Sequence, residues 1–223
     1  PVDYSTDDNT AANTDIVSVS LSKEQTKSVL EEIHKAYNNQ IEDVLLMALV
    51  DAFAKWTGER KLRLDIKGNV RDKTFKDVNL CRTVGSFTTY FPVRLDIAKS
   101  SDLGEALIAV KEYLRNIPNS GIDYGILQYL SSEQKIQSKL QNLPLSEVSF
   151  NYLGHHDQMI LDSSLFRLPQ TSQGINYSTP SNRYLLQINA VVVQEQLQLQ
   201  WVYSNAIHRR EKIEKLANGY IEA

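Results

Sequence analysis

Residues 184–203 read YLLQINAVVVQEQLQLQWVY, and this stretch decides how the chain folds. It holds two strand-like runs, 184–193 and 197–203, with the polar residues 194–196 between them. Apolar and β-branched residues that recur along such runs are typical of strands with a buried face. The pattern predicts a β-hairpin with its turn at 194–196, followed by a closing helix from about residue 209 to 221.

The rest of the chain adds strands and helices in a mixed order. Strand-like runs occur at 16–21, 62–66, 87–95 and 147–153. Apolar residues at helical spacing predict helices over 41–56 and 102–114, and a capping-box signature at Ser22 and Gln25 predicts a helix over 22–37. Residues 124–130 form only a short apolar segment. This order predicts an α/β fold, in which a mixed sheet is covered by helices in a two-layer α+β sandwich.

Two segments lack this periodicity. Residues 7–15 are rich in Asn, Thr and Asp, which predicts a mobile linker over 1–15 and one folded unit over 16–223. Residues 157–183 carry Ser, Thr, Asn, Gly and Pro, so we expect an irregular excursion there. Because the sequence starts at Pro1 without an initiating Met, we expect it to be part of a longer polypeptide.

The composition argues against several classes of protein. The net charge of −3 comes from intermixed signs and offers no basic field for nucleic acid. No apolar run approaches the roughly 18 residues that a membrane span requires, and the first residues do not resemble a signal peptide. Cys81 is the single cysteine, which excludes an internal disulfide. We expect a cytoplasmic protein that binds neither nucleic acid nor a membrane.

Short motifs for a classical site are missing. The sequence contains no Walker phosphate loop, no Rossmann glycine fingerprint and no paired cysteines for zinc. His155 and His156 precede Asp157, but adjacent histidines in a strand point to opposite faces, so we favour a strand-end loop over a metal site. His208 stands beside two arginines, which favours a solvated position.

Longer sequence words carry more information. They are IKGNVRD at 66–72, RTVGSFTTYFPV at 82–93, IPNSGIDYGILQYL at 117–130 and SFNYLG at 149–154. Each alone has a structural interpretation, such as a tight turn at Gly85 or a helix stop at Pro118. Together and in this order, over about residues 16–221, they resemble the epimerization domains of nonribosomal peptide synthetases. These domains belong to the condensation superfamily, which has the chloramphenicol-acetyltransferase-like fold.

The resemblance implies a two-lobed domain of which this chain is the C-terminal lobe. In the family, the lobes face each other across a tunnel, and the phosphopantetheine arm of a carrier protein brings an aminoacyl or peptidyl thioester into it. The implied partners are an N-terminal lobe, a peptidyl carrier protein and neighbouring synthetase modules. No metal and no directly bound cofactor is implied. The family's His-His-x-x-x-Asp-Gly motif belongs to the first lobe and is absent from this sequence.

The resemblance also points to four site residues. Lys67 stands at the position of the family's acid/base glutamate, and its side chain carries the opposite charge to a carboxylate base. Arg71 matches the arginine of the same motif. Asn151 and Tyr152 match an Asn-Tyr pair that lines the family's active site, so polarising, orienting or proton-relay roles are implied for these residues.

A structural interpretation of the same residues stays open. Arg71 then pairs with Asp72 or Asp65, and Tyr152 only packs in the core. Ser86 replaces a tryptophan that is usual in the family, which implies an altered tunnel floor.

Epimerization sets the conditions for activity. It removes an α-proton beside a thioester and returns one to the opposite face, so acid/base groups must flank the carbon. One lobe cannot surround the carbon, and we expect the isolated chain to be inactive. Three functions are open: a lobe of a domain that converts L- to D-residues on a carrier protein, a degenerate lobe kept for docking, or part of a peptide-bond-forming condensation domain.

Overall fold

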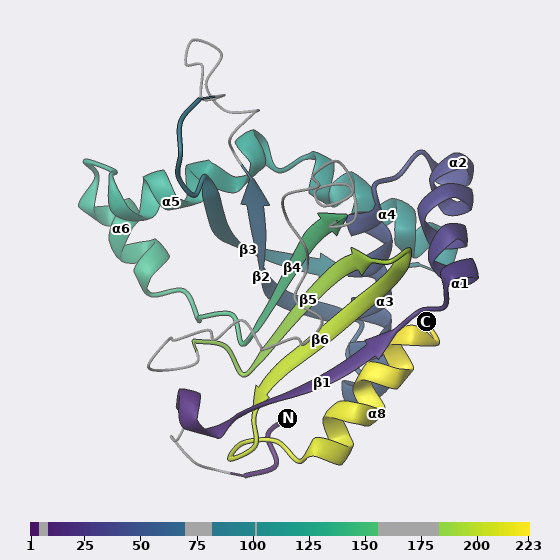
Figure 1. Cartoon of the computed structure of the whole chain (residues 1–223). Coiled ribbons are helices and arrows are strands. Elements are labelled where there is room, and N and C mark those ends of the chain that lie inside the picture. Colours follow the sequence, from purple (N-terminus) through teal and green to yellow (C-terminus); the bar gives the residue numbers. More distant parts are fainter. Residues whose placement is uncertain (5–8, 70–81, 101, 156–182) are drawn as a thin grey trace.

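The computed structural model describes residues 1–4, 9–69, 82–100, 102–155 and 183–223. Within them the strands form a single six-stranded sheet in the order β1-β6-β5-β4-β2-β3 (Figure 1). The strands are β1 (Thr14–Ser20), β2 (Lys61–Asn69), β3 (Thr88–Asp96), β4 (Val148–His155), β5 (Leu186–Val193) and β6 (Gln196–Ser204). Strand β4 pairs in parallel with both β2 and β5, and the other pairs are antiparallel. The predicted mixed sheet is confirmed.

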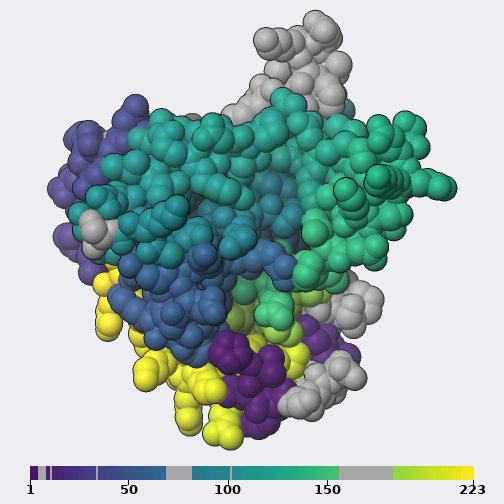
Figure 2. Space-filling view, turned by 180° about the vertical axis from the view of Figure 1, so that it is seen from behind, coloured from purple at the N-terminus to yellow at the C-terminus, as the bar shows by residue number. Residues whose placement is uncertain are grey.

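Helices cover one face of this sheet. Helices α3 (Ile41–Thr57), α4 (Leu103–Arg115) and α8 (Arg210–Ile221) lie behind it in Figure 1, and the view from behind in Figure 2 shows α3 and α4 covering the strands. The core lies between the two layers. Its fully buried side chains include Leu49, Leu64, Ile188, Leu199, Trp201 and Ile213. The two-layer α/β sandwich expected from the sequence is therefore confirmed.

Helix α3 is the central element of the helix layer. A capping box starts it, in which the carboxylate of Asp43 accepts a hydrogen bond of 2.7 Å from the backbone N–H of Gln40. Gly58 ends it with a φ of 80°, a left-handed conformation that glycine adopts without steric cost. Residues 43–50 of this helix are all buried, so α3 has no solvated face over this length. The sequence prediction for this helix is confirmed.

The hairpin of β5 and β6 forms as predicted. Val193 pairs with Gln196, and Gln194 and Glu195 make the turn with φ values of 51° and 63°. Such left-handed pairs match the twist of the flanking strands. Side chains along β5 alternate between buried and half-buried positions, which puts every second residue into the core.

Three details differ from the sequence predictions. The helix predicted over 22–37 is divided into α1 (Lys23–Lys27), a π-helical turn (Ser28–Glu32) and α2 (Ile33–Tyr37). The apolar segment 124–130 belongs to a helix, α5 (Ile122–Tyr129), which follows a short 3-10 turn (Pro118–Gly121). A further helix, α6 (Gln134–Gln141), was not predicted, because its sequence QKIQSKLQ offers few apolar residues.

The described residues of the expected linker 1–15 contact the folded body. The backbone N–H of Asp3 donates to Ile207 O at 3.0 Å, and its carboxylate accepts from Arg209 N at 2.9 Å. A 3-10 turn (Ala11–Asn13) precedes β1. This strand starts at Thr14, two residues before Ile16, where ordered structure was expected to begin. The mobility of the linker and the boundary at residue 16 stay predictions. The excursion predicted over 157–183 lies outside the described residues except for Arg183.

No described helix has the length and apolar character needed to cross a membrane.

Candidate functional site

A cavity of about 770 Å³ lies where β2 and β4 end. The N-terminus of α3, the C-terminus of α4 and the 3-10 turn at 118–121 complete its wall. Lys67, Asn151 and Tyr152 all line it, so the structure brings together three of the four site residues that the sequence suggested. Parallel pairing of β2 with β4 is the cause, because it aligns Ile66 with Phe150 and carries the following residues of both strands to the same end of the sheet.

Lys67 comes from β2 and lies opposite Tyr90 of β3. Lys67 is half-buried, lines the cavity and carries a positive charge. The next residue, Gly68, explains the close approach of the 3-10 turn. A Cβ atom at this position would lie 2.7 Å from Ser120 O, so only glycine lets this turn pack against β2 beside Lys67.

Asn151 is held across the sheet by β5. Its side-chain Nδ2 donates to Asn189 Oδ1 at 3.4 Å, and the two residues are register partners in the parallel pair β4–β5. This bond orients the amide of Asn151 at the cavity wall.

Tyr152 places its hydroxyl in a dry position. The oxygen is buried and has no hydrogen-bond partner among the described residues. Burial, with a further contribution from the negative charge of Glu42, raises the pKa of Tyr152 to about 12. The phenol is therefore neutral at physiological pH, and a neutral phenol can donate a hydrogen bond.

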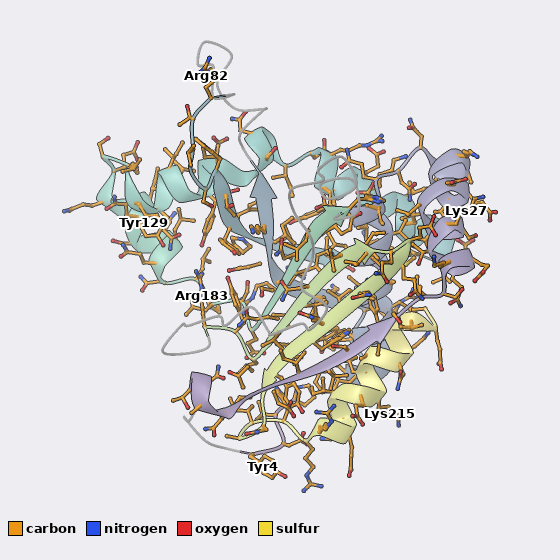
Figure 3. All side chains as sticks on the ribbon, viewed as in Figure 1. Tyr4, Lys27, Arg82, Tyr129, Arg183 and Lys215 are labelled. Atoms are coloured by element: carbon orange, nitrogen blue, oxygen red, sulfur yellow. The ribbon has the colours of Figure 1, made fainter. Side chains whose placement is uncertain are left out.

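Arg71 lies outside the described residues, so its position stays a prediction. Asp65, one of the two partners considered for it, is buried and has other contacts. Its carboxylate accepts hydrogen bonds from Tyr184 Oη at 2.8 Å and from Arg183 Nη2 at 3.3 Å. Figure 3 labels Arg183 near the start of β5. Burial raises the pKa of Tyr184 above its ordinary value, and the hydrogen bond to the Asp65 carboxylate raises it further.

Sequence reasoning missed further residues of the cavity. Glu42 and Asp43 reach it from the first turn of α3, and Arg115 reaches it from the last turn of α4. Burial raises the pKa of the Asp43 carboxyl despite its hydrogen bond from Gln40 N. The only signal in the sequence was two acidic residues before a long apolar helix, which also fits simple helix capping. Ser86, whose departure from the family was noted, lines the cavity as well.

Two other expectations from the sequence concern histidines. His208 was expected on the surface, and this was wrong: its side chain is 2% exposed, and burial lowers its pKa. A turn in which His208 N donates to Ser204 O at 2.9 Å tucks the ring inward, whereas Arg209 and Arg210 stay exposed. His155 is exposed at the end of β4, and its neighbours His156 and Asp157 lie outside the described residues. The described residues contain no cluster of three or more His, Cys, Asp or Glu suited to a metal ion.

Comparison with known proteins gives relatives of one kind. A protein of the linear gramicidin synthase of Brevibacillus parabrevis is 40% identical over 226 residues, which is 100% of this chain and 3% of that protein. Chondramide synthase cmdD of Chondromyces crocatus is 38% identical over 223 residues, which is 100% of this chain and 6% of that protein. The chain therefore spans only a few per cent of the length of these curated relatives.

The solved structures agree with the sequence relatives. The epimerization domain from the third module of tyrocidine synthetase B is 33% identical and superposes with a TM-score of 0.88, over 100% of this chain and 49% of that one. A family model described as the condensation domain matches residues 1–223. The mixed sheet, the helix layer and this match over the whole length show that the chain belongs to the condensation-domain family.

Proposed function

We propose that residues 16–223 are the C-terminal lobe of an epimerization domain of a nonribosomal peptide synthetase. The complete domain converts L- to D-configured aminoacyl or peptidyl thioesters on a carrier protein. The observation that carries the proposal is the meeting of Lys67, Asn151 and Tyr152 in one cavity. The 33% identity to a solved epimerization domain over the whole of this chain supports it.

The cavity offers the donors that this chemistry requires. Removal of the α-proton beside a thioester leaves an enolate, whose oxygen must be stabilised by nearby hydrogen-bond donors or positive charge. The neutral phenol of Tyr152, the oriented amide of Asn151 and the ammonium group of Lys67 are groups of this kind. In this proposal the substitution of lysine for the family's glutamate changes the role at this position from proton transfer to charge stabilisation.

The proposal requires partners outside this chain. The described residues line the cavity from one side, and an N-terminal lobe supplies the acid/base group for the opposite face of the carbon. A peptidyl carrier protein brings the thioester on its phosphopantetheine arm, and neighbouring modules of the synthetase load it. The isolated chain is therefore inactive.

Lys67 favours a second candidate, a degenerate lobe that docks a carrier protein or a neighbouring domain without catalysis. A domain that no longer catalyses the reaction does not need the family's acid/base glutamate, so a cation can stand at its position. The two candidates differ in one result, which is the configuration of the carrier-bound residue after contact with the complete domain.

A stereochemical assay tests the proposal. A carrier protein is loaded with an L-aminoacyl thioester and incubated with the full-length domain that contains this chain, and the released amino acid is resolved on a chiral column. The expected result is a mixture of L- and D-forms that is reached from either starting enantiomer. Retention of the starting configuration over many hours, with the carrier bound to the domain, would favour docking.

A further inference from the structure

The cavity contains a second source of acid/base chemistry besides Lys67. Among the residues that the structure describes, its charged or titratable side chains are Glu42 and Asp43 from α3, Lys67 from β2, Arg115 from α4 and Tyr152 from β4. The proposed reaction needs a group that accepts the α-proton, and an ammonium group or a neutral phenol does not accept one. A carboxylate does, so Asp43 and Glu42 are the candidates.

Asp43 is already engaged in the structure of the helix. Its side chain is 5% exposed, and its carboxylate Oδ2 accepts the backbone N–H of Gln40 at 2.7 Å. This hydrogen bond holds the start of α3, and movement of the carboxylate toward a substrate would break it. We therefore assign Asp43 to the helix cap.

Glu42 is more accessible than Asp43. It lies on the same turn of α3, lines the cavity and is only half-buried. Its negative charge contributes to the raised pKa of Tyr152, which places the carboxylate within electrostatic range of the buried phenol. Glu42 from α3 and Tyr152 from β4 thus line the same cavity.

We propose that Glu42 is the proton acceptor of this lobe and takes over the task for which the family uses the glutamate at the position of Lys67. This inference rests on the proposed epimerization function. In the step, the α-C–H bond breaks, the proton moves to a carboxylate oxygen of Glu42, and the electron pair becomes the enolate. Tyr152 and Lys67 stabilise the enolate oxygen. A proton donor on the opposite face, outside this chain, then returns a proton to the carbon.

The structural alternative is that Glu42 only interacts with the positive N-terminal end of α3. Glu105, in the first turn of α4, is a matched control, because it is also a first-turn glutamate but does not line this cavity. Each substitution removes one negative charge from the first turn of its helix. Only Glu42→Gln is expected to affect proton transfer.

The test uses the full-length domain with a carrier protein that holds an aminoacyl thioester, in deuterated water. Incorporation of α-deuterium is followed by mass spectrometry. We expect Glu42→Gln to lower the exchange rate about 100-fold or more, Glu42→Asp to lower it less, and Glu105→Gln to leave it within about twofold of wild type. The double variant Glu42→Gln/Lys67→Glu is expected to recover at least about tenfold over Glu42→Gln, because it returns a carboxylate to the cavity.

The pH profile separates a proton acceptor from a helix-stabilising residue. A proton acceptor must be deprotonated to work, so exchange by the wild type should fall at acidic pH, and this fall should be lost in Glu42→Gln. Asp43, Lys67, Arg115 and Tyr152 face the same cavity and remain unchanged in that variant. If Glu42→Gln does not fold, Glu42→Asp carries the test, since its shorter side chain should slow exchange at an unchanged melting temperature.

The outcomes separate the two proposals. Exchange by the wild type together with an unchanged rate in Glu42→Gln, or in a folded Glu42→Asp when Glu42→Gln does not fold, would overturn the role of Glu42 and leave epimerization standing. No exchange by the wild type would overturn both. Loss of exchange in Glu105→Gln to the same extent as in Glu42→Gln would show a helix effect and overturn the role of Glu42.

Discussion

At the scale of single residues, Tyr152 separates a catalytic site from simple packing. Its hydroxyl is buried without a partner among the described residues, so removing it costs little stability or increases it slightly. We predict that Tyr152→Phe keeps the melting temperature of the wild type or raises it, and lowers α-deuterium exchange by the full-length domain about 10- to 100-fold. Unchanged exchange would support the interpretation that Tyr152 only packs.

His208 gives a prediction for the pH dependence of stability. Burial lowers its pKa from the ordinary value of 6.5, so the folded chain binds fewer protons at this ring than the unfolded chain. Its contribution is fully present above pH 6.5 and decreases as the pH falls below that value. We expect the urea midpoint of the wild type to fall between about pH 7 and 5, and His208→Phe to flatten this slope. An equal slope in both proteins would contradict the prediction.

The sequence predicted some of these residues and missed others for physical reasons. The resemblance to a family identified Lys67, Asn151 and Tyr152. Their spacing along the chain could not have done so, because it does not show that β2 and β4 pair in parallel. Glu42 was missed, because an acidic residue in the first turn of a helix is common without a catalytic role. His208 was predicted to be exposed because two arginines follow it. The prediction was wrong because a turn directs its side chain inward while the arginines stay exposed.

At the scale of elements, the hairpin of β5 and β6 places every second side chain of β5 in the core. Ile188 of β5 is fully buried, whereas Val191 on the other face is half-buried. We predict that Ile188→Ala lowers the free energy of unfolding by about 2–5 kcal/mol, and that the control Val191→Ala lowers it by less than half as much. Urea unfolding measures both. Equal losses would contradict the assignment of the core to the helix-covered face.

Strong patterns predicted elements, and weak patterns did not. The long apolar helix α3 and the hairpin were predicted within two residues of their observed bounds. The π-helical turn at 28–32 leaves no mark on hydrophobic periodicity, because one extra residue shifts the pattern only locally. Helix α6 carries only Ile136 and Leu140 as apolar residues, and such a polar segment also fits a loop.

At the scale of the whole molecule, one cavity collects polar and charged side chains from both layers of the fold. The strands β2 and β4 and the region of α3 and α4 bring two cations, two carboxylates, a phenol and two amides to one place. Proton transfer to both faces of a carbon requires groups on both sides. The resemblance to a two-lobed family suggested a half-site, which stays a prediction, and this chain covers 49% of the solved epimerization domain.

The most direct measurement is α-deuterium exchange on a carrier-bound aminoacyl thioester, carried out in parallel with the isolated 223-residue chain and with the full-length domain. Our account predicts exchange by the full-length domain and none above background by the isolated chain. Exchange by the isolated chain at the rate of the full-length domain would contradict it, because this lobe alone would then contain the complete acid/base machinery.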